Sequence, residues 1–329
     1  MPDRKYLITK NTSVAPVHGP HPVWDKFLHE TTRGDEGFKR FLQQMCGYFL
    51  SGETNEHALF FVYGTGGNGK SVFLNTVANI LGDYAVTAPM DVFTASKSDR
   101  HPTELAMLRG ARLVAVSETE EGRAWKESQL KSLTGGDKIT ARYMRQDFFT
   151  YTPQFKLLII GNHKPKISNV DEAIKRRIYI VPFVHKPLEP DKYLEDKLRL
   201  EYPQILHWMF EGLDDWRRHG LIRPAVVQAA TDEYFETQDF FGHWLDDNCE
   251  RQPGFQELAT PLFENWKAYA ERKGERPGTT GTLSERLLAR GFTKERTRDG
   301  IMYFGLTLKK IPAPVLYPVP GQPNFPQQI

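Results

Sequence analysis

The feature that most constrains this chain is a glycine-rich loop between an apolar run and a helical pattern. Residues 58–64, ALFFVYG, are almost continuously apolar, which is typical of a strand buried on both faces of a parallel sheet. Residues 64–71, GTGGNGKS, then fit the phosphate-binding pattern G-x-x-x-x-G-K-[ST] at every position. Residues 71–81 follow with helical spacing. Strand, loop and helix together predict an α/β core built on a parallel sheet.

Each residue type in this loop suits a polyphosphate. The candidate binding residues are Gly64, Thr65, Gly66, Gly67, Asn68, Gly69, Lys70 and Ser71. Glycines let backbone N–H groups curl around phosphate oxygens, Lys70 can meet the β- and γ-phosphates, and the Ser71 hydroxyl can ligate Mg²⁺. The next helix directs its positive end at the same anion. The other interpretation is a glycine-rich turn with a surface lysine.

Two further apolar runs end in polar residues that could complete a hydrolytic site. They are RLVAVSE at 112–118 and FKLLIIGN at 155–162. Parallel strands bring such ends to one edge of the sheet. A hydrolase needs a carboxylate that holds metal or orients water, and Glu118 is the first acid after its strand. Asn162 could touch water or the γ-phosphate, or only cap a turn.

A basic, aromatic segment between these runs predicts a hairpin. KITARYM and FFTYTP flank RQD (145–147), which we interpret as two strands around a tight polar turn. Lys138, Arg142 and Arg145 lie on or near it. Positive charge along a groove is the general means of binding a single strand irrespective of its sequence. The alternative is a solvated hairpin edge that prevents aggregation.

Composition limits the other possibilities. The 329 residues carry a formal charge of only +2, so a nucleic-acid surface must come from local clustering of Lys and Arg. The two cysteines, Cys46 and Cys249, form no grouping typical of zinc or of a disulfide framework. No stretch approaches the ~20 apolar residues of a membrane span. We therefore expect a cytoplasmic protein without membrane contact.

The order of patterns predicts five segments. They are a lead-in with two amphipathic helices at 1–55, the α/β core at 56–187, a helical region at 188–250, a winged-helix-like region at 251–310 and a proline-rich tail at 311–329. A hairpin turn at Asp299-Gly300 predicts the wing, and TLSE at 282–285 predicts a helix start. Five basic residues near the wing could grip duplex DNA or form a solvated face: Arg286, Arg290, Lys294, Arg296 and Arg298.

Three segments carry a resemblance to a known family. YFLSGETNEHALFFVYGTGGNGKSVFLNTVANILGDYAVTAP, LRGARLVAVSETEEGRAWKESQLKSLTGGDKITARYMRQDFFTYTPQFKLLIIGNHKP and DEAIKRRIYIVPF resemble the superfamily 3 helicase portion of phage and plasmid primase-helicases. The resemblance covers roughly residues 24–310. It implies an AAA+-type ATPase, usually a hexameric ring, that moves 3′-to-5′ on single-stranded DNA.

The same resemblance implies roles for individual residues. Gly64 to Ser71 correspond to the Walker A loop, Glu118 to the acidic end of Walker B and Asn162 to sensor 1. Arg176 and Arg177 correspond to the region of the arginine finger, with either residue open. The chain has Ser117 where many AAA+ proteins have an aspartate, so metal is expected on Ser71, Glu118 and water.

The expected function is an ATP-dependent DNA helicase in the replication of a phage, plasmid or other mobile element. Expected cofactors are ATP and Mg²⁺. Expected partners are single-stranded and forked DNA, further copies of the chain assembled through the N-terminal helices, and a primase domain or a polymerase. One alternative is an ATP-switched initiator or loader without processive unwinding. Another is a P-loop kinase that phosphorylates a small molecule.

Overall fold

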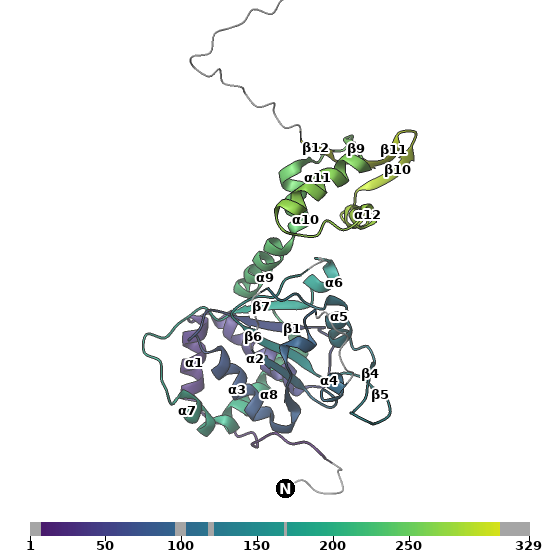
Figure 1. The fold of residues 1–329 in the computed structure, drawn as a ribbon. Helices are drawn as coiled ribbons and strands as arrows, with labels where there is room; N and C mark the ends of the chain where they lie inside the picture. The colour runs from purple at the N-terminus through teal and green to yellow at the C-terminus, as the bar shows by residue number, and fades with distance from the viewer. Residues whose placement is uncertain (1–7, 96–102, 118–121, 168–169, 310–329) are drawn as a thin grey trace, which may run out of the picture. The chain divides into compact units, whose positions relative to one another are not determined.

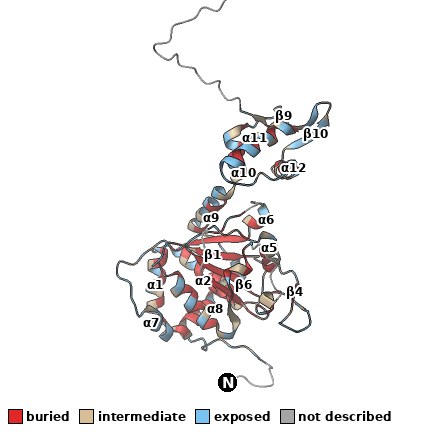
Figure 2. Ribbon diagram, in the orientation of Figure 1, coloured by how far each residue is buried: buried red, intermediate tan, exposed pale blue. Residues whose placement is uncertain are grey.

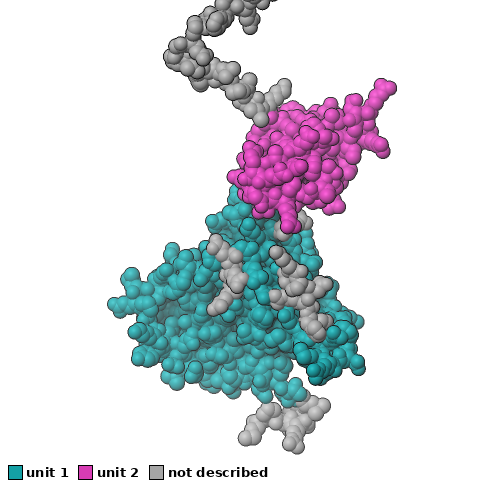
Figure 3. Space-filling view, in the orientation of Figure 1, with its two compact units in different colours: residues 1–238 teal, residues 239–329 magenta. Residues whose placement is uncertain are grey.

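The computed structural model describes residues 8–95, 103–117, 122–167 and 170–309. The chain divides into two compact units, residues 1–238 and 239–329 (Figure 3). The boundary therefore lies inside the helical region that the sequence pattern assigned to 188–250. The physical reason is that Phe241 and Trp244 pack into the core of the second unit rather than that of the first.

Unit 1 is built around a parallel sheet, as the apolar runs predict (Figure 1). In the described residues its strand order is β2-β3-β6-β1-β7, and every neighbouring pair is parallel. The strands are β1 (Leu59–Tyr63), β2 (Ala85–Thr87), β3 (Leu113–Ser117), β6 (Lys156–Gly161) and β7 (Ile178–Pro182). The α/β fold class is confirmed.

Alternation along the strands builds two cores, one on each face of the sheet (Figure 2). Phe60 and Val62 of β1 belong to one core, and Leu59 and Phe61 to the other. Side chains of a strand point to opposite faces in turn, so a continuous apolar run fills both. The first core is packed by α1 (Pro22–Thr32), α2 (Glu36–Leu50), α3 (Lys70–Leu81), α7 (Leu194–Leu200) and α8 (Tyr202–His219). The second core includes residues of α4 (Thr103–Ala106), α5 (Glu127–Gly135), α6 (Glu172–Lys175) and α9 (Ala225–Gln238).

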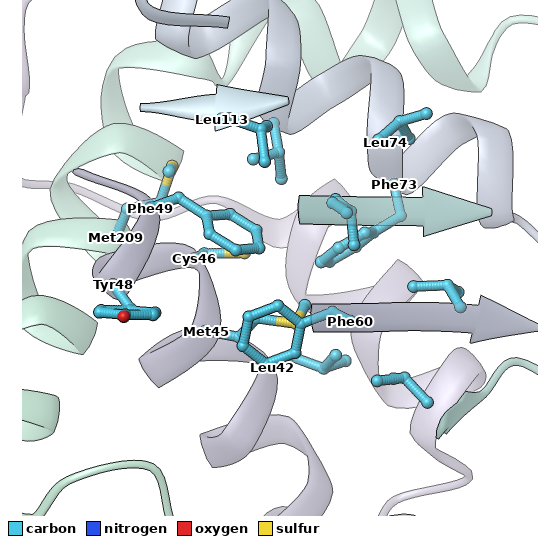
Figure 4. Close-up of a cluster of buried hydrophobic side chains, with 14 of the residues drawn as sticks. Leu42, Met45, Cys46, Tyr48, Phe49, Phe60, Phe73, Leu74, Leu113 and Met209 are labelled. Carbon is cyan, nitrogen blue, oxygen red and sulfur yellow. The ribbon is translucent and has the colours of Figure 1, made fainter. Parts of the chain in front are cut away.

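The N-terminal helices are part of the sheet's own core rather than a separate segment. Residues of α2 surround Phe60 of β1, and Phe73 of α3 lies nearby (Figure 4). Trp24 of α1 stacks on Phe73 at 5.8 Å between ring centroids. The backbones of α2 and α8 also lie close together at Gly47, where an added side-chain carbon would lie only 2.1 Å from Leu213 N. The helices α1 and α2 therefore fold together with the α/β core.

Unit 2 has the helices and hairpin expected of a winged-helix region. Antiparallel strands join in the order β10-β11-β9, and β12 pairs with β8. The elements are α10 (Phe240–Asn248), β8 (Cys249–Glu250), β9 (Gln256–Leu258), α11 (Ala259–Arg272), α12 (Thr280–Ala289), β10 (Thr293–Thr297), β11 (Gly300–Phe304) and β12 (Thr307–Leu308). Thr279 caps α12, so the helix starts earlier than the capping box expected at 282–285, because Thr279 and Thr282 bond reciprocally.

The aromatic residues of the helical region are packing residues. Trp208, Trp216, Tyr234 and Phe235 are buried in unit 1, while Trp244 is buried in unit 2. Among the helices of the described residues, none has both the length and the apolar character needed to cross a membrane.

Candidate functional site

The strand register brings the loop and the sensor position to one edge of the sheet. Tyr63, the last residue of β1, pairs with Gly161, the last of β6, and Ser117 of β3 pairs with Ile160. Because β6 lies between β1 and β3, Asn162 leaves the sheet between the glycine-rich loop and the end of β3. Glu118, the expected catalytic carboxylate and metal ligand, lies outside the described residues.

The lysine of the loop is held across the loop itself. Lys70 is only 7% exposed, and its Nζ donates to the Gly64 carbonyl oxygen at 2.6 Å and to Asn68 Oδ1 at 2.9 Å. The Asn68 amide in turn donates to the carbonyl oxygen of Phe183, just after β7. Burial, and secondarily the charge of Lys186, lower the pKa of Lys70. The side chain of Asn68 therefore braces the loop, and only its backbone N–H is left to face a phosphate.

The crown of the loop has room for an anion. Gly67 and Gly69 have φ of 80° and 81°, which strains any L side chain, and a side-chain carbon at Gly66 or Gly67 would meet open space. No described side chain caps the N-terminus of α3, and Ser71 is exposed on its first turn. An uncapped helix start beside an open, glycine-rich turn fits a polyphosphate.

The expected Mg²⁺ ion would also be bound at this loop. Across the described parts of the chain, side chains of His, Cys, Asp and Glu form no group of three or more that could hold a metal ion. Of the two expected metal ligands, Ser71 is exposed on the first turn of α3, whereas Glu118 lies outside the described residues. Mg²⁺ suits such a site, since it keeps several waters and needs few protein ligands.

Lys164 is a basic residue near this edge that the sequence patterns did not single out. Its Nζ lies 4.3 Å from the centre of the ring of Tyr63, the residue that directly precedes the glycine-rich loop. Burial lowers its pKa, and Glu233 opposes this shift. The only sequence signal was its position two residues after Asn162, which is weak because lysines are common in loops.

The two arginines after α6 have different surroundings. Arg177 is 9% exposed, and its Nη1 donates to the Ala173 carbonyl oxygen at 2.6 Å. Burial and the neighbouring Arg176 lower the pKa of Arg177. Arg176 is exposed. The short helix before them is fixed by Asp171, which caps it through Ile174 N at 2.8 Å and pairs with Lys131 at 2.5 Å. Only Arg176 therefore presents its side chain to the surroundings of this chain.

The basic hairpin exists, but its connecting loop is longer than expected. Its strands are β4 (Ile139–Ala141) and β5 (Phe149–Tyr151), joined by residues 142–148, and within this loop Gln146 N donates to Tyr143 O at 3.1 Å to close a tight turn. Arg145 adopts a left-handed conformation, with φ of 59°, inside this longer loop. Just beyond the two strands, the Arg142 guanidinium lies 4.8 Å from the centre of the Phe148 ring.

The hairpin is anchored at its base and exposed at its tip. The hydroxyl of Tyr151 donates to Leu105 O at 2.6 Å, and Tyr143 donates to Ala106 O at 3.3 Å. Met144 and Phe148 at the tip are 68% and 59% exposed. Lys138 and Arg145 are exposed as well, while Arg142 is half-buried. The structure therefore brings Lys138, Arg142 and Arg145 into one hairpin with exposed apolar side chains.

Of the five basic residues that the sequence indicates near the wing, three are engaged within unit 2. The guanidinium of Arg286 lies over Phe241 and Trp266, at 5.6 and 5.5 Å. Arg290 pairs with Asp239, and Lys294 donates to Ser284 Oγ. The remaining pair, Arg296 and Arg298, is exposed on the hairpin of the wing. The described surface of α12 consequently presents little positive charge for duplex DNA.

Comparison with known proteins gives relatives that align with 63–71% of the chain. A model for a family of unknown function, DUF5906, matches residues 62–177. The putative helicase L207/L206 of Acanthamoeba polyphaga mimivirus is 28% identical over 71% of the chain, and the putative helicase 121R of Invertebrate iridescent virus 3 is 33% identical over 69%. The putative primase C962R of African swine fever virus is 24% identical over 63%. The chain spans 27%, 28% and 24% of these relatives' lengths.

Among solved structures, the C-terminal region of NrS-1 (residues 305–718) is similar in fold. The TM-score is 0.57 at 10% identity, over 90% of this chain and 78% of that one. This likeness concerns the fold alone. The names of the sequence relatives agree with the helicase resemblance, although they come from large DNA viruses rather than from phages or plasmids. The chain is thus similar in sequence to putative helicases and primases of large DNA viruses, and it has the α/β fold of the NrS-1 C-terminal region.

Proposed function

We propose that the chain is an ATP-dependent motor of a DNA helicase that acts in the replication of a virus or another mobile element. The observation that carries the proposal is the loop at the end of β1, where Lys70 is buried and the crown is open beside Asn162. The viral relatives named putative helicase support the same assignment.

The residues of the loop have separable tasks in this proposal. Lys70 neutralises β- and γ-phosphate charge after exchanging its contacts with Gly64 O and Asn68 Oδ1 for phosphate oxygens. The N-terminus of α3 adds its positive end, and Ser71 ligates Mg²⁺. Bound Mg·ATP supplies the phosphoanhydride bond. Asn162 orients the attacking water, and Glu118 polarises that water as a general base.

The proposed assembly of several copies rests on the exposed Arg176. Arg176 is the candidate arginine finger because Arg177 is committed to Ala173 inside its own chain. A finger supplied in trans stabilises transition-state charge only when a second copy is present. We therefore propose a homo-oligomeric ring of the AAA+, superfamily 3 type, hexameric by resemblance, with ATP bound between copies.

The hairpin is the proposed contact with single-stranded DNA. Lys138 and Arg145 would neutralise phosphates, and the exposed Phe148 would stack on bases, a combination that binds single strands of any sequence. Movement of the hairpin with nucleotide state would then pull one strand, with 3′-to-5′ polarity implied by the resemblance. Because the curated relatives are about four times as long as the aligned part, a primase domain or a polymerase is a proposed partner at forked DNA.

The test is ATP hydrolysis by the purified chain with and without single-stranded DNA. Lys70→Ala and Glu118→Gln should abolish both basal and DNA-stimulated hydrolysis. Lys267→Ala, which removes an exposed lysine paired with Glu271 in unit 2, is the matched control and should retain both. An assembled ring whose hydrolysis ignores DNA would reject the helicase proposal. DNA-stimulated hydrolysis without displacement of a labelled strand would favour an initiator or loader.

A further inference from the structure

The chain that follows Asn162 is tied to the last turns of α9. The hydroxyl of Tyr234 donates to the Pro165 carbonyl oxygen and accepts from the indole N–H of Trp125 at 2.9 Å. Gln238 Oε1, on the same helix, accepts from Ile167 N at 3.1 Å. Tyr234 and Gln238 are four residues apart and so share one face of the helix. This face therefore holds two points of the chain after β6.

The same tyrosine also holds the chain that follows β3. Backbone hydrogen bonds join the segment after β3 to the segment after β6. Trp125 N donates to Lys166 O at 2.9 Å, and Lys166 N donates to Arg123 O at 2.7 Å. Trp125 then donates to Tyr234 through its side chain. The segments after β3 and β6 are thus paired through their backbones, and the buried hydroxyl of Tyr234 bonds to both segments.

A third connection leads to the phosphate loop. The ammonium of Lys164 lies 4.3 Å from the Tyr63 ring and 5.9 Å from the Tyr234 ring. Tyr63 is the last residue of β1 and directly precedes Gly64. Each residue from Lys164 to Ile167 therefore contacts β1, the segment after β3 or α9.

Ordinary core packing does not account for the hydroxyl. Tyr234 is 2% exposed among apolar neighbours, and a phenylalanine would fill the same volume. Burying a hydroxyl is unfavourable unless it is hydrogen-bonded. Here both of its bonds go to segments that leave the candidate site, and not to the helix that carries it. The hydroxyl therefore fixes the spacing of those segments.

We infer that Tyr234 is a positioning residue for ATP hydrolysis, which holds residues 123–126 and 164–167 together and so sets where Asn162 stands. This inference rests on the proposed ATPase function. Tyr234 itself reaches no phosphate, since its hydroxyl is occupied by Trp125 and Pro165. Because Tyr234 and Gln238 bond to Pro165 and Ile167, we expect the end of α9 to respond when this segment moves on nucleotide binding.

The first test is Tyr234→Phe in the full chain. We expect kcat for ATP hydrolysis to fall by about 10- to 100-fold, as small misplacements of catalytic groups do. The Kd for a fluorescent methylanthraniloyl ATP should stay unchanged, because the contacts of Lys70 and Asn68 are intact. Tyr269→Phe is the control, since it removes another tyrosine hydroxyl, bonded to Asp247 in unit 2. A wild-type kcat in Tyr234→Phe, or parallel losses of kcat and affinity, would overturn the inference.

The second test separates this inference from the proposed function. Amide hydrogen exchange is measured with and without Mg²⁺ and adenylyl imidodiphosphate. We expect slower exchange in residues 64–74, 164–167 and 231–238 of the wild type, with the α9 response lost in Tyr234→Phe. Protection of 64–74 without any change in 164–167 or 231–238 would overturn the inference and leave the nucleotide site standing. Exchange that is unchanged everywhere would overturn both.

Discussion

Replacing Gly47 by alanine should push α2 away from α8. A side-chain carbon at position 47 would lie 2.1 Å from Leu213 N and 2.3 Å from the carbonyl carbon of Gly212. Both are backbone atoms, so no change of rotamer can relieve the overlap. Ordinary contacts of this kind begin near 3.4 Å, so the two helices must separate locally by about 1.3 Å.

The expected loss follows from two opposing effects. Overpacking a well-filled interior costs about 1–3 kcal/mol, and the backbone on both sides places this case near 3 kcal/mol. Alanine returns about 1 kcal/mol because glycine is a poorer helix former. The free energy of unfolding of unit 1 should therefore fall by about 2 kcal/mol, a large part of the 5–15 kcal/mol typical of a folded protein.

Urea unfolding of the full chain, followed by far-ultraviolet circular dichroism, measures this loss. The transition of unit 1 should shift to lower urea, while that of unit 2 serves as an internal reference. Gly135→Ala is the matched control, because a side-chain carbon there has no neighbour closer than 3.7 Å. It should be as stable as the wild type or more so. Equal unfolding midpoints for Gly47→Ala and Gly135→Ala would refute the close-approach argument.

Four further predictions concern single side chains. Glu201→Ala should destabilise unit 1 by about 1–2 kcal/mol in urea unfolding, because this carboxylate accepts the first N–H groups of α1 at 3.0 and 2.9 Å. Burial lowers the pKa of Lys156 to about 6 from its usual 10.5, so the unfolded chain binds the extra proton between these values. Stability should then rise with pH above about 6, by about 1.4 kcal/mol per pH unit, and urea unfolding at several pH values should show no such slope in Lys156→Met. Arg176→Ala should abolish hydrolysis by the assembled protein at an unchanged Tm, whereas Arg177→Ala should lower the Tm; the reverse pattern would assign the finger to Arg177. Arg145→Ala should reduce the slope of log Kd against log salt for single-stranded DNA by about 0.7, and an unchanged slope would remove this residue from the DNA contact.

Local features of this protein could be predicted from the sequence because they depend on neighbouring residues. The strand at 58–64, the glycine-rich loop and the helix after it occur where the apolar run and the spacing indicate them. The wing hairpin also occurs where expected, but its turn residues are Arg298 and Asp299, because Gly300 already pairs with Thr297 as the first residue of β11. Even here the exact limits differed, because the strands of the basic hairpin end at Ala141 and begin again at Phe149, outside the turn expected at residues 145–147.

Tertiary structure alone decided how the site is assembled. Strand order put β6 between β1 and β3, and so put Asn162 beside the phosphate loop. Burial distinguished Arg177 from Arg176, although the two are adjacent in sequence and chemically identical. The bonds of Tyr234 to Trp125 and Pro165 span 109 and 69 residues. Such contacts depend on which faces pack together, and periodicity reports only that a face is apolar, not what covers it.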